Sequence, residues 1–168
     1  MLYKPVKGCF MMEQILKLLE QNARLSAEDL AAMLDKPVEE IAAMLDMAAE
    51  KGYIRGYRTL VDWEAFGANT VRAIIELQVK PKKSRGFDEI ADIIADFDEV
   101  ESLMLISGGY DLQLVMKGRS FQEIALFVAK RLSPLDDVLS TATHFVLHTY
   151  KKDGARYVTE EPDERECN

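Results

Sequence analysis

Apolar residues recur at helical spacing in the first third of the chain: Met12, Ile15, Leu16 and Leu19. This spacing predicts an amphipathic helix. Ser26 precedes two acidic residues and has the character of an N-cap, so it predicts the start of a second helix. A third helix is predicted from the Lys-Pro pair at 36–37 to Gly52. Residues 53–61 are expected to be extended. Three short helices followed by a β ribbon have the order of a winged helix-turn-helix, and we assign this head to residues 1–62.

After Asn69 the apolar pattern alternates as in strands, interrupted by two helical stretches. Strands are predicted at residues 71–79, 100–107, 110–117 and 138–150. Helices are predicted at residues 87–97 and from an N-cap at Ser120 to Leu132. The order β-α-β-β-α-β is that of the ferredoxin-like split βαβ arrangement, which we assign to residues 63–150. The predicted fold class is therefore α+β. Residues 151–168 are expected to form a charged tail, disordered or loosely docked.

The two helices are expected to cover one face of this sheet. The other face should then present apolar and aromatic side chains and pack on a second copy of the chain. Between the two central strands lies a glycine pair, within Ser107-Gly108-Gly109-Tyr110-Asp111. We name residues 107–111 the glycine turn. Glycine lets a ligand approach the backbone closely, and an acidic residue beside tyrosine can hold the ammonium group of a small molecule. The alternatives are an ordinary hairpin, with Asp111 capping a neighbouring N–H group and Tyr110 packing on a partner subunit.

The chain has 168 residues and a formal net charge of −8. No apolar run approaches the ~20 residues that span a bilayer, and no secretory signal is recognisable, so a cytoplasmic protein without a membrane partner is expected. Cys9 and Cys167 lack metal-ligand spacing. His144 and His148, on one strand, would lie about 13 Å apart and could not share an ion within one chain. We find no nucleophile–base constellation, phosphate loop or metal cluster, so the sequence favours neither an enzyme nor a bound cofactor or metal.

Several stretches together resemble those of one protein family: Ile15–Ser26, Asp29–Ala31, Gly52–Tyr57, Phe66-Gly67, Val100–Ser102, Ser107–Leu112 and Leu139–His144. Over about residues 11–150 the chain resembles the Lrp/AsnC (feast/famine) transcriptional regulators. The resemblance implies a DNA-binding regulator whose C-terminal domains pair into dimers or multiples of dimers. It also implies that an amino acid or a related small molecule binds between those domains. The positions that match the family's effector site are Gly108, Gly109, Tyr110 and Asp111, with Thr141 and Thr143 on the last strand.

The third helix departs from this family, which usually places arginines there. A projection at about 100° per residue gives an outward face with four carboxylates. That face comprises Glu39, Glu40, Ala43, Asp46, Met47 and Glu50. DNA binding draws much of its affinity from Lys and Arg, and this face has neither. The residues left for DNA contact are Lys4, Lys7, Lys36, Lys51, Arg55 and Arg58, with several heads acting together in one oligomer. The alternatives are sparse base reading through DNA shape, or an oligomeric small-molecule-binding protein with a degenerate acidic head that contacts protein instead of DNA.

Overall fold

The computed structural model describes residues 9–83 and 85–157. Its internal contacts divide the chain into two compact units, one ending at Thr59 and the other beginning at Leu60. Two predicted DNA-contact residues, Lys4 and Lys7, lie outside the described residues. Each unit is described by itself.

The first unit contains the three predicted helices: α1 (Cys9–Gln21), α2 (Ala27–Leu34) and α3 (Val38–Glu50). Their apolar faces meet in one core, whose buried members are Ile15, Leu19, Leu30, Ala31 and Ile41. The predicted N-cap of α2 is confirmed, because the Ser26 hydroxyl accepts the Asp29 N–H group at 3.1 Å and the Asp29 carboxylate accepts the Ser26 N–H group at 2.9 Å. Hydrogen bonding to the Asp29 carboxylate, first from the Ser26 backbone N–H group and then from the Ser26 side chain, lowers the pKa of Asp29.

Gly52 ends α3 as predicted, with a φ of +66°. The Tyr53 N–H group donates to Ala48 O at 2.8 Å and the Gly52 N–H group to Ala49 O at 2.9 Å. This pair of bonds is the Schellman arrangement, which satisfies the last carbonyl groups of a helix. The β ribbon expected over residues 53–61 is not formed, because within the described residues this extended segment meets no second strand with which to pair.

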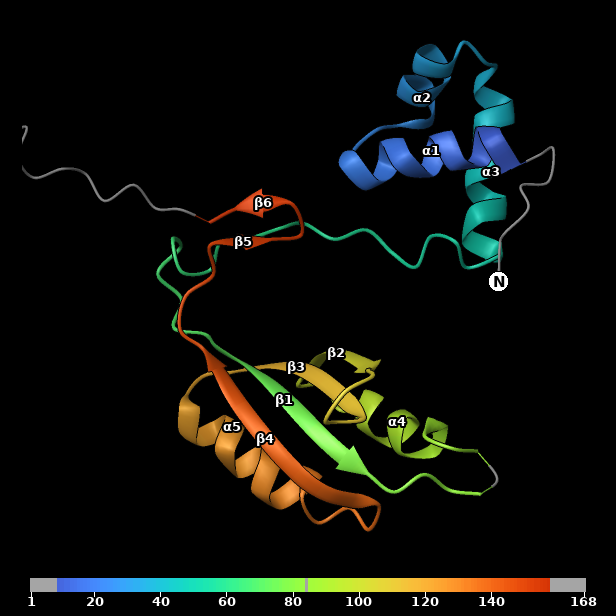
Figure 1. Cartoon of the computed structure of the whole chain (residues 1–168). Coiled ribbons are helices and arrows are strands. Elements are labelled where there is room, and N and C mark those ends of the chain that lie inside the picture. Colours follow the sequence, from blue (N-terminus) through green and yellow to red (C-terminus); the bar gives the residue numbers. More distant parts are fainter. Residues whose placement is uncertain (1–8, 84, 158–168) are drawn as a thin grey trace, which may run out of the picture. The chain divides into compact units, whose positions relative to one another are not determined.

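The second unit contains a four-stranded antiparallel sheet of order β2-β3-β1-β4 (Figure 1). Its elements follow the predicted βαββαβ order, which confirms the ferredoxin-like arrangement. They are β1 (Val71–Val79), α4 (Asp88–Ala95), β2 (Val100–Leu105), β3 (Leu112–Gly118), α5 (Phe121–Phe127) with the π-helical turn η1 (Val128–Leu132), and β4 (Val138–Val146).

The helices α4 and α5 cover one face of this sheet, and the core lies between the two layers (Figure 1). Alternate residues of β1, such as Ile75 and Leu77, are fully buried there against Ile94 of α4 and Ile124 of α5. Phe145 of β4 is also on this side, because it pairs with Ala73 and its ring meets that of Phe121 edge to face at 4.8 Å.

The opposite side of the sheet, which we name the open face, is mixed in character. Its central positions are the half-buried apolar residues Ile74, Val115, Ala142 and Val146. Around them Arg72 pairs with Glu101 at 3.1 Å, and His144 contacts Glu76 at 3.2 Å. The expectation of aromatic side chains on this face is wrong, because strand alternation places Phe145, the aromatic residue of β4, on the helix side.

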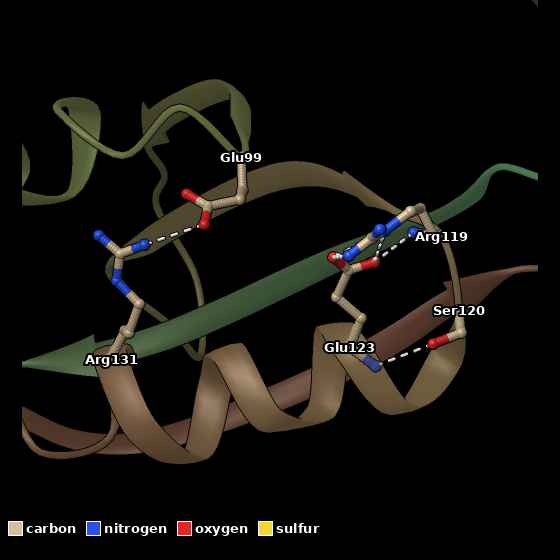
Figure 2. A network of polar contacts seen from close by, with 5 residues as sticks. All are labelled: Glu99, Arg119, Ser120, Glu123 and Arg131. Carbon is tan, nitrogen blue, oxygen red and sulfur yellow. Dashed lines mark hydrogen bonds and ion pairs between the residues drawn. The ribbon is translucent and has the colours of Figure 1, made fainter.

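Two groups of polar contacts lie at the two ends of the α5–η1 helix (Figure 2). At the start of α5, the Ser120 hydroxyl accepts the Glu123 N–H group at 3.1 Å, while the Glu123 carboxylate accepts the Arg119 N–H group at 2.6 Å. Hydrogen bonds from the Arg119 side chain and backbone lower the pKa of Glu123. At the end of η1, Arg131 pairs with Glu99 at 2.9 Å.

The chain after β4 departs from the sequence-based expectation. The last strand ends at Val146, and part of the predicted charged tail forms a small hairpin of β5 (Lys151–Lys152) and β6 (Ala155–Arg156). Its turn residues are Asp153 and Gly154, with φ values of +47° and +83°. An Asp-Gly pair is a strong hairpin signal. The signal was missed because the flanking residues are polar and lack the alternation of a buried strand.

Candidate functional site

The glycine turn is attached firmly to the end of β1. The Asp111 N–H group donates to Leu77 O at 2.9 Å, and one Asp111 carboxylate oxygen accepts the Val79 N–H group at 2.9 Å. The register of β1 with β4 shifts between Gln78 and Val79, so the Asp111 carboxylate takes a backbone donor at this irregularity. Asp111 thus accepts a backbone N–H group, as in the capping alternative, but the donor belongs to the distant strand β1 and not to the turn itself. The carboxylate has two oxygens, and the second has no hydrogen-bond partner in the described part of the chain.

The tip of the glycine turn is bare. A Cβ atom added to Gly108 or to Gly109 would meet no atom within 4 Å. Gly108 has a φ of +157°, which side-chain-bearing residues rarely adopt. Tyr110 and Asp111 are half-buried, whereas the two glycines are exposed. A ligand could thus approach the backbone of an exposed turn whose acidic neighbour is held in place.

Thr141 and Thr143 lie elsewhere on the sheet. They pair with Leu77 and Ile75, which are buried in the core, so the alternation of strands places both threonines on the helix side. Within one chain they are not brought to the open face. Gln78, which the sequence did not suggest, does contact the turn: its Nε2 donates to Gly109 O at 2.8 Å. Ser140, also not suggested, supports Gln78, because its hydroxyl donates to Gln78 Oε1 at 2.9 Å.

A hollow of about 300 Å³ lies at the other end of β1. Its walls include Trp63, Arg72, Phe121, His148 and Tyr157. It contains no member of the glycine turn and neither threonine. The two glycines are exposed, so the tip of the glycine turn is an exposed edge of the single chain.

The head has an acidic surface where DNA would be read. Every residue of the predicted outward face of α3 is exposed, including the four carboxylates of Glu39, Glu40, Asp46 and Glu50. Within the described residues none of these carboxylates forms an ion pair with a lysine or arginine. Exposed carboxylates at this place would oppose the approach of phosphates.

The described basic candidates stand at the two ends of α3. Lys36 is exposed just before it, and Lys51 is exposed at its C-cap. The guanidinium of Arg55 lies against Gly52, where an added Cβ would be 3.1 Å from Arg55 Cζ. A cation at this place also faces the carbonyl end of α3, which favours positive charge. Arg58 is exposed in the extended segment that follows.

Comparisons with known proteins identify both parts of the chain. A model of the Lrp/AsnC ligand-binding domain matches residues 72–156, and a model of the winged helix-turn-helix DNA-binding domain matches residues 12–55. The chain belongs to the Lrp/AsnC family. It is 42% identical over 153 residues to the uncharacterised HTH-type transcriptional regulator YugG of Bacillus subtilis, covering 90% of this chain and 92% of that protein. Its relatives are transcriptional regulators, and its two matched domains make this Lrp/AsnC protein a regulator rather than an enzyme.

Solved structures of this family share the fold. Escherichia coli AsnC aligns with a TM-score of 0.66 at 23% identity, covering 89% of this chain and 97% of AsnC. A Neisseria meningitidis transcriptional regulator in complex with L-Met aligns with a TM-score of 0.68 at 22% identity, covering 85% of this chain and 92% of that one. These similarities support the α+β assignment.

Two further findings on the described residues concern membrane-spanning helices and metal-binding groups. None of their helices is both long and apolar enough to cross a bilayer. Within the same residues, no group of three or more His, Cys, Asp or Glu side chains could hold a metal ion.

Proposed function

We propose that this Lrp/AsnC protein is a DNA-binding regulator whose C-terminal domain senses an amino acid or a similar small molecule at the glycine turn. One observation carries the proposal: the turn combines exposed, bare glycines with a carboxylate fixed by the Val79 N–H group. The second oxygen of the Asp111 carboxylate, for which the described residues provide no partner, is suited to accept a hydrogen bond from an ammonium group. The bare backbone of Gly109 leaves room for the rest of the molecule.

The relatives add support for this class of ligand. The Neisseria meningitidis regulator, which shares the fold, is in complex with L-Met. An amino acid carries the ammonium group that the Asp111 carboxylate would recognise. Thr141 and Thr143 belong to the proposed site only if it extends to the helix side of the sheet, because β4 places both side chains there.

A second copy has a plausible place to bind. The open face carries a half-buried apolar centre at Ile74, Val115 and Val146. Around it lie the Arg72–Glu101 ion pair and the polar contact between His144 and Glu76. An apolar centre with a polar rim is typical of interfaces between subunits. We therefore propose a homo-oligomer, a dimer or a multiple of dimers, in which effector binding changes the arrangement of the heads.

The proposed effector role is tested by thermal unfolding of the full-length protein with each of the twenty L-amino acids. A ligand that binds only the folded state at 100 times its Kd stabilises that state by about 2.7 kcal/mol. We expect at least one amino acid to raise the Tm, and its N-acetyl derivative, which lacks the ammonium group, to have no effect. Absence of any shift across the twenty would contradict the proposal.

DNA binding is proposed to use the cations around α3: Lys36, Lys51, Arg55 and Arg58, together with Lys4 and Lys7 of the N-terminal arm. A specific observation favours the alternative head that does not bind DNA, namely the four exposed carboxylates of α3. A mobility-shift assay on the upstream region of the protein's own gene, across a salt series, separates the two. Loss of two phosphate contacts in the variant R55A/R58A should reduce the salt slope by about two.

The matched control for that assay is Arg24→Ala, which removes an exposed arginine of the same head outside the proposed contact set. It should leave the slope unchanged. Absence of a specific shift at low salt would favour the head that does not bind DNA. A specific shift with an unaltered slope in R55A/R58A would instead exclude these two arginines as phosphate contacts.

A further inference from the structure

Two side chains outside the predicted site form a hydrogen-bonded chain that ends on the glycine turn. Gln78 of β1 and Ser140 of β4 are direct cross-strand partners on the open face. The Ser140 hydroxyl donates to Gln78 Oε1 at 2.9 Å, and Gln78 Nε2 donates to Gly109 O at 2.8 Å. We infer that Gln78, held by Ser140, is a positioning residue that fixes the Gly109 peptide for effector binding. The inference rests on the proposed function and deepens it.

The peptide geometry explains why one hydrogen bond matters at this place. Glycine has the largest backbone freedom of any residue, and a Cβ added to Gly109 would meet no atom within 4 Å. The bond from Gln78 holds its carbonyl group. A trans peptide is planar, so the Tyr110 N–H group of the same peptide unit is then fixed in the opposite direction. We name the hydrogen-bonded chain from Ser140 through Gln78 to Gly109 O the relay. The relay therefore fixes the direction of the Tyr110 N–H group, which lies between the two exposed glycines and Asp111.

Ser140 holds the far end of the carboxamide. The Gly109 carbonyl can only accept a hydrogen bond, so it requires the NH2 end of the glutamine amide to face the turn. The oxygen end is then held by the Ser140 hydroxyl, which donates to it. Removing the hydroxyl leaves the Gln78 side chain with one anchor instead of two, so a smaller fraction of molecules keeps the bond to Gly109 O.

The two links can be broken separately. Gln78→Glu keeps an acceptor for Ser140 but has no donor for Gly109 O at neutral pH. Ser140→Ala keeps Gln78 but removes one of its two anchors, and Ser140→Thr retains the hydroxyl and should restore wild-type behaviour. Gln122→Glu makes the same chemical change at an exposed position of α5 and serves as the control.

The first measurement needs no ligand: the 15N resonance of Tyr110 in the full-length protein, whose peptide unit includes the Gly109 carbonyl. It should move in Gln78→Glu and Ser140→Ala and stay in place in Ser140→Thr and Gln122→Glu. The second is thermal-shift titration with the twenty L-amino acids. Loss of one hydrogen bond should weaken the apparent affinity of the first two variants about two- to tenfold, since only a fraction of molecules keeps the competent turn.

The outcomes separate the inference from the function on which it rests. Equal affinity in wild type, Gln78→Glu and Ser140→Ala would overturn the inference while leaving the effector site in place. An unmoved Tyr110 resonance in both variants would overturn the relay itself. If no amino acid stabilises the wild-type protein, the proposed function fails, and the effect of the relay on effector affinity fails with it.

Discussion

Replacing Asp111 by asparagine and by alanine distinguishes the two roles that this carboxylate has in the structure. One oxygen accepts the Val79 N–H group at 2.9 Å, and the other is available to an effector. Asparagine keeps a carbonyl oxygen that can accept the same N–H group but removes the negative charge. Alanine removes both the acceptor and the charge. The pair therefore separates support of the turn from recognition of an ammonium group.

The magnitudes follow from the burial of the donor. Val79 is only 3% exposed, so in Asp111→Ala its N–H group is left with little access to water. A buried donor without a partner costs about 1–3 kcal/mol, and a hydrogen bond to a charged group contributes about 1.5–3 kcal/mol. We expect Asp111→Ala to lower the free energy of unfolding by about 1.5–3 kcal/mol, which corresponds to about 3–12 °C in Tm for a chain of this length. Asp111→Asn should lose less than about 1 kcal/mol.

Thermal unfolding with and without the stabilising amino acid measures both the stability of each variant and its ligand-induced shift in Tm. If the charge binds the effector, Asp111→Asn melts close to wild type and loses the ligand-induced shift. An asparagine variant that retains the full shift would refute the ammonium contact and leave Asp111 as a support of the turn. An alanine variant as stable as wild type would refute the role assigned to the Val79 hydrogen bond.

Three further variants test the surrounding structure. Gly52→Ala should cost about 1–2 kcal/mol in urea unfolding, because alanine is strained at a φ of +66° and its Cβ would crowd Arg55. Gly109→Ala should change stability by less than about 1 kcal/mol, since its Cβ meets open space, but should weaken the effector-induced thermal shift. The pKa of Asp29 is lowered in the folded state, so wild type should be more stable than Asp29→Asn above about pH 4, with the difference vanishing as pH falls below the ordinary value of 3.8.

The sequence was most informative where a periodic pattern meets a strong local signal. The strand 71–79 was predicted with its observed bounds, because alternate residues from Ala73 to Val79 are buried against the helices. The N-cap at Ser26 and the glycine end of α3 at Gly52 were predicted from side-chain chemistry that acts within a few residues. Local rules suffice for such features, because neither depends on which distant segment lies nearby.

The features that sequence reasoning missed depend on pairing between distant strands. Gln78 contacts Gly109 only because the register of β1 with β3 and β4 places them together. The side of the sheet on which Thr141 and Thr143 lie also follows from register, since a shift of one residue reverses every side chain. Periodicity alone predicts that a strand exists but not which residue faces which neighbour.

The charge on the exposed face of α3 is independent of the fold. Packing of α3 requires only its apolar side, such as Ile41 and Ala48, so the exposed side can carry any charge without changing the fold. A carboxylate roughly 10 Å from a phosphate is repelled by only about 0.4 kcal/mol in water before salt screening. Four such repulsions weaken DNA binding by one head but do not abolish it. Since linked heads multiply weak affinities, specific binding by this chain would have to come from the oligomer and from the cations at the ends of α3.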